Sequence, residues 1–327
     1  MTQKTDLNVS PYFDDFDETD NFNRVLFRPG FAIQARELTQ LQSTLQGQIE
    51  RHGSHIFAEG AMVVPGNSLL NLQYYSLKLA STFASETVDP SQYFNSTTPV
   101  TITGATSGVT AVVVGFDAAT STDQPTLYVR YLATGTDNET SFFADGENIS
   151  SNAGVTHVTS YSSDIVSATT FTSSFSAAAG SSAANLASST GPASRKGSAV
   201  TVQAGVYYIR GMFVTCSEET FVLDKYSNTP SYRVGFTVTE NLVTPESDTT
   251  LLDNSTGSSN FAAKGAHRLQ ISLALSKIDR DSTADNTFVE IMDVKDGVIQ
   301  SQVRTTEYSV LEETLARRTF DESGNYT

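Results

Sequence analysis

Residues 232–238 read YRVGFTV and residues 267–275 read HRLQISLAL, and in both stretches large apolar side chains alternate with polar or small ones. A period of two places successive side chains on opposite faces of a strand, so each stretch predicts a β-strand. The same alternation occurs in residues 126–131 (TLYVRY) and 100–103 (VTIT). Turn residues, mainly Gly, Asn and Asp, separate such stretches. The sequence therefore predicts a mainly β chain of several sandwich-like or barrel-like modules.

One amphipathic helix is expected near the N-terminus, over residues 31–52. Four large apolar residues with spacings of 3, 4 and 4 share one helical face, namely Leu38, Leu41, Leu45 and Ile49. Pro29 and Gly30 precede the helix, and Gly53 supplies a stop signal. No further helix is expected before residues 311–317, so the overall class is α+β.

The apolar face of this helix has two interpretations. It is either a seam between subunits of an oligomer or the underside of a helix that lies on a sheet of its own chain. In the seam interpretation, Leu38 and Leu45 share one heptad position, while Gln34, Leu41 and Gln48 share the other. Polar residues in a seam can fix the register and the number of helices in a coiled coil.

Composition divides the chain into four segments: an N-terminal arm, helix and first strands (1–92), an inserted acidic β-module (93–165), an Ala/Ser-rich linker (166–199) and a C-terminal β-domain (200–327). Ala, Ser and Gly account for 20 of the 27 residues in 173–199, so this stretch cannot build a core of its own. Residues 81–165 hold nine acids against one base, Arg130, which is half of the net charge of the chain.

The formal net charge of −16 over 327 residues excludes some partners. An acidic surface repels phosphate backbones and anionic lipid, so we expect neither nucleic acid nor membrane insertion. No stretch approaches the ~18 apolar residues of a membrane span. Cys216 is the only cysteine, so the fold cannot depend on an internal disulfide, and its apolar neighbours in 211–215 predict a buried thiol.

The first 30 residues are irregular and aromatic-rich, which fits either an arm that docks onto a neighbour or a strap across the chain's own core. The acidic run 14–20 (DDFDETD) predicts a solvated face. The N-terminus has no apolar segment of signal-peptide type, so we expect synthesis and folding in a host cytoplasm.

The sequence contains none of the nucleophile-elbow, zinc-protease or phosphate-loop motifs, so we expect neither an enzyme nor a cofactor. His52 and His55 have a spacing that can hold a metal. A histidine at a helix end also interacts favourably with the helix dipole, which explains the pair without a metal.

A calcium loop is the best candidate for an ion site. Its positions 1, 3, 5, 7 and 12 would be Asp279, Asp281, Thr283, Asp285 and Glu290. Ala284 stands where such a loop needs glycine, and both flanks have the pattern of strands. A polar hairpin tip therefore explains the same residues.

Three stretches carry a resemblance to known proteins. Residues 27–43 (FRPGFAIQARELTQLQS) resemble a signature near the start of many baseplate and fibre-attachment proteins of T4-like phages, cyanophages among them. Residues 226–236 (YSNTPSYRVGF) with 263–269 (AKGAHRL), and residues 318–326 (RTFDESGNY), extend the match along the chain. Together they resemble a family of large phage structural proteins known as a domain of unknown function. This resemblance implies a virion component and carries over no catalytic residue.

We therefore expect a structural component of a phage tail, in the baseplate or the proximal tail fibre, that mediates assembly and host attachment in the virion. Its expected partners are other tail proteins, further copies of itself with three-fold symmetry, and a host surface receptor. One alternative is a receptor- or glycan-binding module that uses residues 93–165. Another is a polysaccharide-degrading tail enzyme.

Overall fold

The structure, a computed structural model, describes residues 5–64, 67–83, 86–121, 123–156, 170–176, 192–283, 286–303 and 308–324. Strands contain 41% of the residues and helices 16%, which confirms the predicted mainly β, α+β class. The chain divides into two compact units. Unit 1 comprises Met1–Leu69, Val200–Phe221 and Ser231–Thr327, and unit 2 comprises Leu70–Ala199 and Val222–Pro230.

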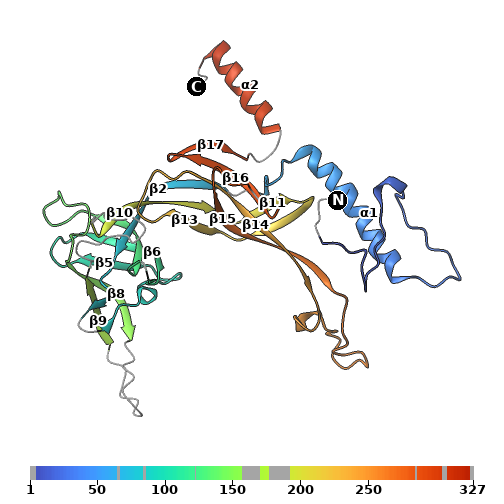
Figure 1. Ribbon diagram of the computed structural model, residues 1–327, viewed down its shortest axis with the longest axis horizontal. Coiled ribbons are helices and arrows are strands. Elements are labelled where there is room, and N and C mark those ends of the chain that lie inside the picture. The colour runs from blue at the N-terminus through green and yellow to red at the C-terminus, as the bar shows by residue number, and fades with distance from the viewer. Residues whose placement is uncertain are drawn as a thin grey trace. The chain divides into compact units, whose positions relative to one another are not determined.

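The largest sheet has eight strands in the order β13-β10-β2-β7-β6-β5-β8-β9 (Figure 1). These strands are β2 (Ser68–Lys78), β5 (Val100–Gly104), β6 (Thr110–Asp117), β7 (Thr126–Ala133), β8 (Asn148–Thr156), β9 (Thr170–Ser176), β10 (Ser194–Val202) and β13 (Glu219–Asp224). A ribbon of β3 (Thr82–Phe83) and β4 (Glu86–Thr87) and the 3-10 turn Pro90–Tyr93 also belong to unit 2.

The core of unit 2 forms because the strands alternate as the sequence predicts. In β5, Val100, Ile102 and Gly104 are buried while the two threonines between them are half-buried. Leu77 of β2 and Leu127 of β7, which face each other in register, are fully buried in the same cluster. The predicted strands over 100–103 and 126–131 are thus confirmed.

Unit 1 contains two smaller sheets. The three-stranded sheet has the order β1-β11-β12, from Met62–Val64, Gly205–Ile209 and Met212–Cys216. The four-stranded sheet has the order β15-β14-β16-β17, from Arg268–Asp279, Tyr232–Val243, Phe288–Lys295 and Val298–Gln302. The long β14–β15 pair confirms both strands that open the sequence analysis, and it stays in register from Tyr232↔Asp279 to Val243↔Arg268.

Gly235 marks an irregularity between β14 and β16. The backbone of Val289 approaches Gly235 so closely that a Cβ would collide with its carbonyl group. The neighbouring Phe236 packs edge-to-face on Tyr207 of β11, with ring centroids 4.8 Å apart. Both aromatic residues are almost fully buried, so this contact joins the two sheets of unit 1.

The predicted N-terminal helix is α1 (Ala35–Ile56), which begins and ends later than the expected 31–52. It begins at Ala35 because the Glu37 carboxylate accepts a hydrogen bond from the backbone N–H of Gln34 (2.9 Å), which caps the first turn. It continues through Gly53 because that glycine packs against Tyr208 instead of ending the helix. A second helix, α2 (Tyr308–Ser323), is longer than the expected 311–317.

Two expectations about segments need correction. The boundary between units 1 and 2 falls at 69/70 instead of 92/93, so β5–β8 of the expected acidic module share one sheet with β2 and β10. The expected linker 166–199 contains β9 and the start of β10, and its residues 166–169 and 177–191 lie outside the described residues.

Candidate functional site

Residues 5–18 form a strap that is held on unit 1. The Glu240 carboxylate accepts hydrogen bonds from the backbone N–H and the hydroxyl of Thr5 (2.8 and 2.6 Å). The hydroxyl of Tyr12 lies 2.5 Å from Nδ1 of His267. Asp14 is buried and accepts a hydrogen bond from Ser43 of α1. The predicted solvated face is therefore wrong at this first acid of the run 14–20.

A buried ion pair stabilises the strap's anchor. Arg210 Nη1 lies 2.6 Å from Glu240 Oε1, and the two side chains are only 7% and 6% exposed. Arg210 also donates to the carbonyl of Asn286 (2.9 Å), and its backbone N–H donates to Glu59 (2.7 Å). Because these partners satisfy the buried guanidinium, the pair gives Thr5 a fixed acceptor.

Helix α1 packs on unit 1 through its smallest residues. Its buried positions are Ser43, Thr44, Gly47 and Gly53. A Cβ added at Gly53 would lie 2.5 Å from the ring of Tyr208, whose hydroxyl donates a hydrogen bond to the Glu50 carbonyl (2.8 Å). The helix backbone therefore approaches the body of unit 1 too closely for larger side chains on this face.

The large apolar residues of α1 point the other way. Leu38, Leu45 and Ile49 are 51%, 53% and 46% exposed, and Leu41 is half-buried. Hence the interpretation in which this face lies on a sheet of the same chain does not match the described residues. Three of the four residues predicted to form a seam are therefore exposed to solvent in the single chain.

The segment between the strap and α1 is also apolar and exposed. Its open large side chains are Phe22 (71%), Leu26 (75%), Phe27 (45%), Phe31 (66%) and Ile33 (59%). Figure 1 draws this segment in blue as a loop that leads into α1. Together with Leu38, Leu45 and Ile49 of α1, these five residues are called the apolar surface below.

Two ion pairs connect the strap with α1 on either side of this loop. Arg36 Nη1 lies 2.8 Å from Asp15, and Arg51 Nη2 lies 3.4 Å from Glu18. A groove of about 890 Å³ runs beside Leu38, lined also by Tyr12, Leu242 and His267. These solvent-exposed ion pairs link the strap to α1 on either side of the loop 19–34.

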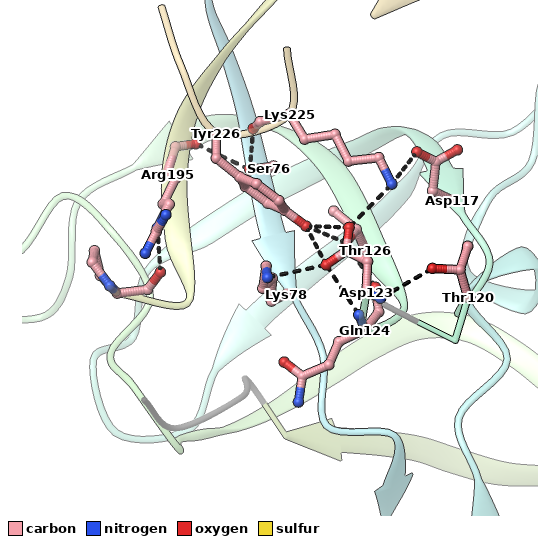
Figure 2. Close-up of polar contacts among 11 residues, drawn as sticks. Ser76, Lys78, Asp117, Thr120, Asp123, Gln124, Thr126, Arg195, Lys225 and Tyr226 are labelled. Carbon is pink, nitrogen blue, oxygen red and sulfur yellow. Dashed lines mark hydrogen bonds and ion pairs between the residues drawn. The ribbon is translucent and has the colours of Figure 1, made fainter. Parts of the chain in front are cut away.

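Unit 2 contains a separate polar cluster, drawn in Figure 2, around a buried lysine. Lys78 at the end of β2 is 0% exposed, and its Nζ lies 3.0 Å from Oδ1 of Asp123. The same ammonium lies 4.3 Å from the ring centroid of Tyr226. The Tyr226 hydroxyl contacts both carboxylate oxygens of Asp123, at 2.8 and 2.7 Å. The contact from Lys78 to Asp123 has the distance of an ion pair but lacks hydrogen-bond geometry among the described residues.

A second ion pair extends the cluster toward solvent. Lys225 Nζ lies 2.9 Å from Asp117 and 3.3 Å from Asp123, and Tyr128 donates to Asp117 (2.6 Å). Burial would raise the pKa of Asp123, but the hydrogen bonds from Tyr226 and the positive charges of Lys78 and Lys225 outweigh it and lower that pKa below its ordinary value. Burial lowers the pKa of Lys225, but Asp117 and Asp123 outweigh it and raise that pKa.

The cluster links segments that are distant from one another in the sequence. The charged partners neutralise one another, and burial raises the pKa of Tyr226, which keeps the phenol protonated as a donor. Asp123, between β6 and β7, is thereby tied to Lys78 of β2 and to the segment that follows β13. Sequence reasoning missed this cluster because Asp123 and Tyr226 are 103 residues apart. The only signal was that Tyr226 opens one of the resembling stretches.

The calcium candidate is only partly described. Asp279 ends β15, Asp281 and Thr283 lie in the turn that follows, and Asp285 lies outside the described residues. Glu290, on β16, is occupied by an ion pair with Arg233 (2.6 Å). Within the described ranges, no three His, Cys, Asp or Glu side chains gather as a metal site.

The other sequence candidates are also placed. His52 and His55 are both exposed on α1, and Cys216 is buried, as predicted. Burial raises the pKa of the Cys216 thiol, which disfavours the reactive thiolate. In the part of the chain that the structure describes, no helix is long and apolar enough to cross a membrane.

Comparison with protein families gives a match over most of the chain. Residues 10–170 and 185–327 match the family described as a domain of unknown function, DUF4815. No curated protein and no solved structure matches the chain. Since the family match covers most of the sequence, the chain belongs to the DUF4815 family.

Proposed function

We propose that this protein is a structural subunit of a phage tail, in the baseplate or at the base of a tail fibre. In this role it acts by assembly and carries out no reaction. The observation that carries the proposal is the apolar surface, in which eight large side chains between residues 22 and 49 are 45% exposed or more. Monomeric proteins rarely expose an apolar patch of more than a few hundred Å².

The size of the apolar surface fits a stable contact. Taking roughly 150–250 Å² for a whole aromatic side chain, these eight residues expose on the order of 800 Å², about what each partner contributes to a standard protein interface. The affinity of a contact of this size depends on packing and preorganisation more than on area. A partner that covers all eight residues would therefore bury about the area of one side of a standard interface.

The resemblance described above supports a tail as the assembly in question. Residues 27–43, which resemble the start of baseplate and fibre-attachment proteins, overlap the apolar surface at Phe27, Phe31, Ile33 and Leu38. The net charge of −16 fits a particle component that must not bind the packaged genome. The proposed partners are further copies of the chain with three-fold symmetry and other tail proteins.

The test is the position of the protein in phage particles. An antibody raised against the purified chain should label the tail end of particles made by the phage that carries this gene. Peptides of the chain should also recur at a constant ratio to tail-tube peptides in mass spectra of purified particles. Particles that lack the chain, or that carry it on the capsid, would refute the proposal.

A further inference from the structure

The exposed positions of α1 follow a heptad that differs from the one read in the sequence. Ala35, Leu38, Gln42, Leu45, Ile49 and His52 are all exposed, with spacings of 3, 4, 3, 4 and 3. This is the alternation of the two seam positions of a coiled coil. The register with Gln34, Leu41 and Gln48 fits less well, because Leu41 is half-buried against its own chain.

We propose that α1 forms a parallel, in-register coiled coil with α1 of further copies of this chain, through these six residues. This inference rests on the proposed assembly role and names the partner of α1. Ala35, Gln42 and Ile49 occupy one seam position, and Leu38, Leu45 and His52 occupy the other. Gln42 forms a polar layer between apolar layers, where such a residue sets the register, and His52 forms a second polar layer at the C-terminal end of the seam.

The opposite side of α1 is already occupied. Ser43, Thr44 and Gly47 are buried there, and Gln46, beside the seam, donates to the carbonyl of Gly211 (2.8 Å). Unit 1 therefore holds α1 in helical form before any partner arrives. A preformed helix spares the ordering cost that makes isolated short helices marginal in water, so about three heptads can suffice.

The charges of α1 favour an identical helix as the occupant. The residues that flank the proposed seam are Thr39, Leu41, Gln46, Gln48, Gly53 and His55, and none of them is Asp, Glu, Lys or Arg. The charged side chains Arg36 and Arg51 pair with Asp15 and Glu18 of their own chain, away from the seam. Parallel identical helices therefore meet without like-charge repulsion, and the seam offers no charge that a different partner would have to match.

Two glutamines of the same helix provide a matched test of the register. Gln42 lies in the proposed seam and Gln48 flanks it, and both are exposed in the single chain. Gln42→Glu would bring identical carboxylates together inside the seam, whereas Gln48→Glu would place them at its edge. We expect Gln42→Glu to raise the dissociation constant about 100-fold or more, and Gln48→Glu to change it by less than about fivefold, because like charges repel most strongly when desolvated.

The readout is the solution mass by light scattering after size exclusion, with circular dichroism to check folding. The wild type and Gln48→Glu should run near three times 35.2 kDa at concentrations where Gln42→Glu runs near 35.2 kDa. A wild type that stays monomeric over the accessible concentration range overturns the inference. So does dissociation by Gln48→Glu with no effect of Gln42→Glu, which would restore the register read from the sequence.

Cysteine cross-linking tests the direction of the helices. Under mild oxidation, Leu38→Cys and Leu45→Cys chains should each form disulfide dimers, because a parallel, in-register seam brings equal positions together in every layer, whereas an antiparallel seam does so only near its midpoint. Arg51→Cys, on the far side of α1, is the matched control and should stay uncross-linked, as should the wild type with its buried Cys216. Equal cross-linking of Leu45→Cys and Arg51→Cys refutes the parallel seam. If Leu45→Cys does not cross-link but the chain is found in phage tails, the assembly role stands, and the apolar surface binds another tail protein instead of a further copy of this chain.

Discussion

Removing the Asp123 carboxylate should destabilise unit 2 strongly. Asp123→Ala leaves the ammonium of Lys78 fully buried and without its counter-charge, and it deprives the Tyr226 hydroxyl of its acceptor. Losing one partner of a buried ion pair costs about 3–5 kcal/mol. The ring of Tyr226, 4.3 Å from the lysine nitrogen, still stabilises the ammonium in the variant, which places the expected loss at the lower end of this range. We therefore expect the free energy of unfolding to fall by about 3 kcal/mol.

Urea unfolding, followed by circular dichroism and tyrosine fluorescence, measures this loss. The matched control is Glu246→Ala, which removes an exposed ion pair with Lys264 (2.6 Å) and should leave the unfolding midpoint nearly unchanged. The double variant Asp123→Ala/Lys78→Met should recover most of the loss, because an uncharged side chain of similar length then fills the same buried space.

Two results would refute this reasoning. A loss below about 1 kcal/mol for Asp123→Ala would mean that the buried ammonium finds another partner or gives up its proton at little cost. A double variant no more stable than Asp123→Ala alone would mean that Asp123 acts through Tyr226 and not through Lys78.

Three further outcomes follow from the same structure. Because the pKa of Asp123 is lower in the folded state than its ordinary value near 3.8, the ionised carboxylate stabilises the fold at pH values above 3.8. This contribution is lost as the pH falls through the folded-state pKa. Asp123→Asn should therefore lose less stability than the wild type between pH 5 and 2 in urea titrations. Gly53→Ala should destabilise α1 because its Cβ would meet the Tyr208 ring, whereas Gly47→Ala, 3.4 Å from the movable Glu18 carboxylate, should be neutral or stabilising in thermal unfolding. Glu240→Ala should release the strap, because Thr5 and Arg210 both lose a buried partner. Limited proteolysis should then cut residues 5–18 faster than in the wild type. An unchanged cutting rate would mean that Tyr12 and Asp14 suffice to hold the strap.

Alternation predicted individual strands well because each strand buries one face. The period of two in residues 100–103 and 267–275 alone located β5 (Val100–Gly104) and most of β15 (Arg268–Asp279). The period carries no information on which strands pair, so the sequence could not place β2 between β7 and β10 in the eight-stranded sheet. For this reason a compositional change at residue 93 suggested a separate module, while hydrogen bonding joins its strands to β2 and β10.

The polar contacts were harder to predict from the sequence than the strands. Lys78 lies in an alternating strand and Asp123 in a turn, and each has an ordinary local pattern. Their meeting depends on the pairing of β2 with β7, which aligns Lys78 with Thr126, three residues from Asp123. Long-range pairing of this kind has to be known before a charged residue in a strand can be assigned a partner.

Helix α1 shows that an amphipathic pattern does not by itself determine which face of a helix is buried against its own chain. Its period separates a face of leucines from a face of Ser43, Thr44, Gly47 and Gly53, and burial of the leucines would be the usual expectation. A turn of the helix that buried the leucines would drive their side chains into the space that the Tyr208 ring fills beside Gly53. Close backbone packing on glycine therefore keeps the leucines outside. Their exposure therefore belongs to the fold of unit 1 itself, and it is this exposure that the proposed assembly role would use.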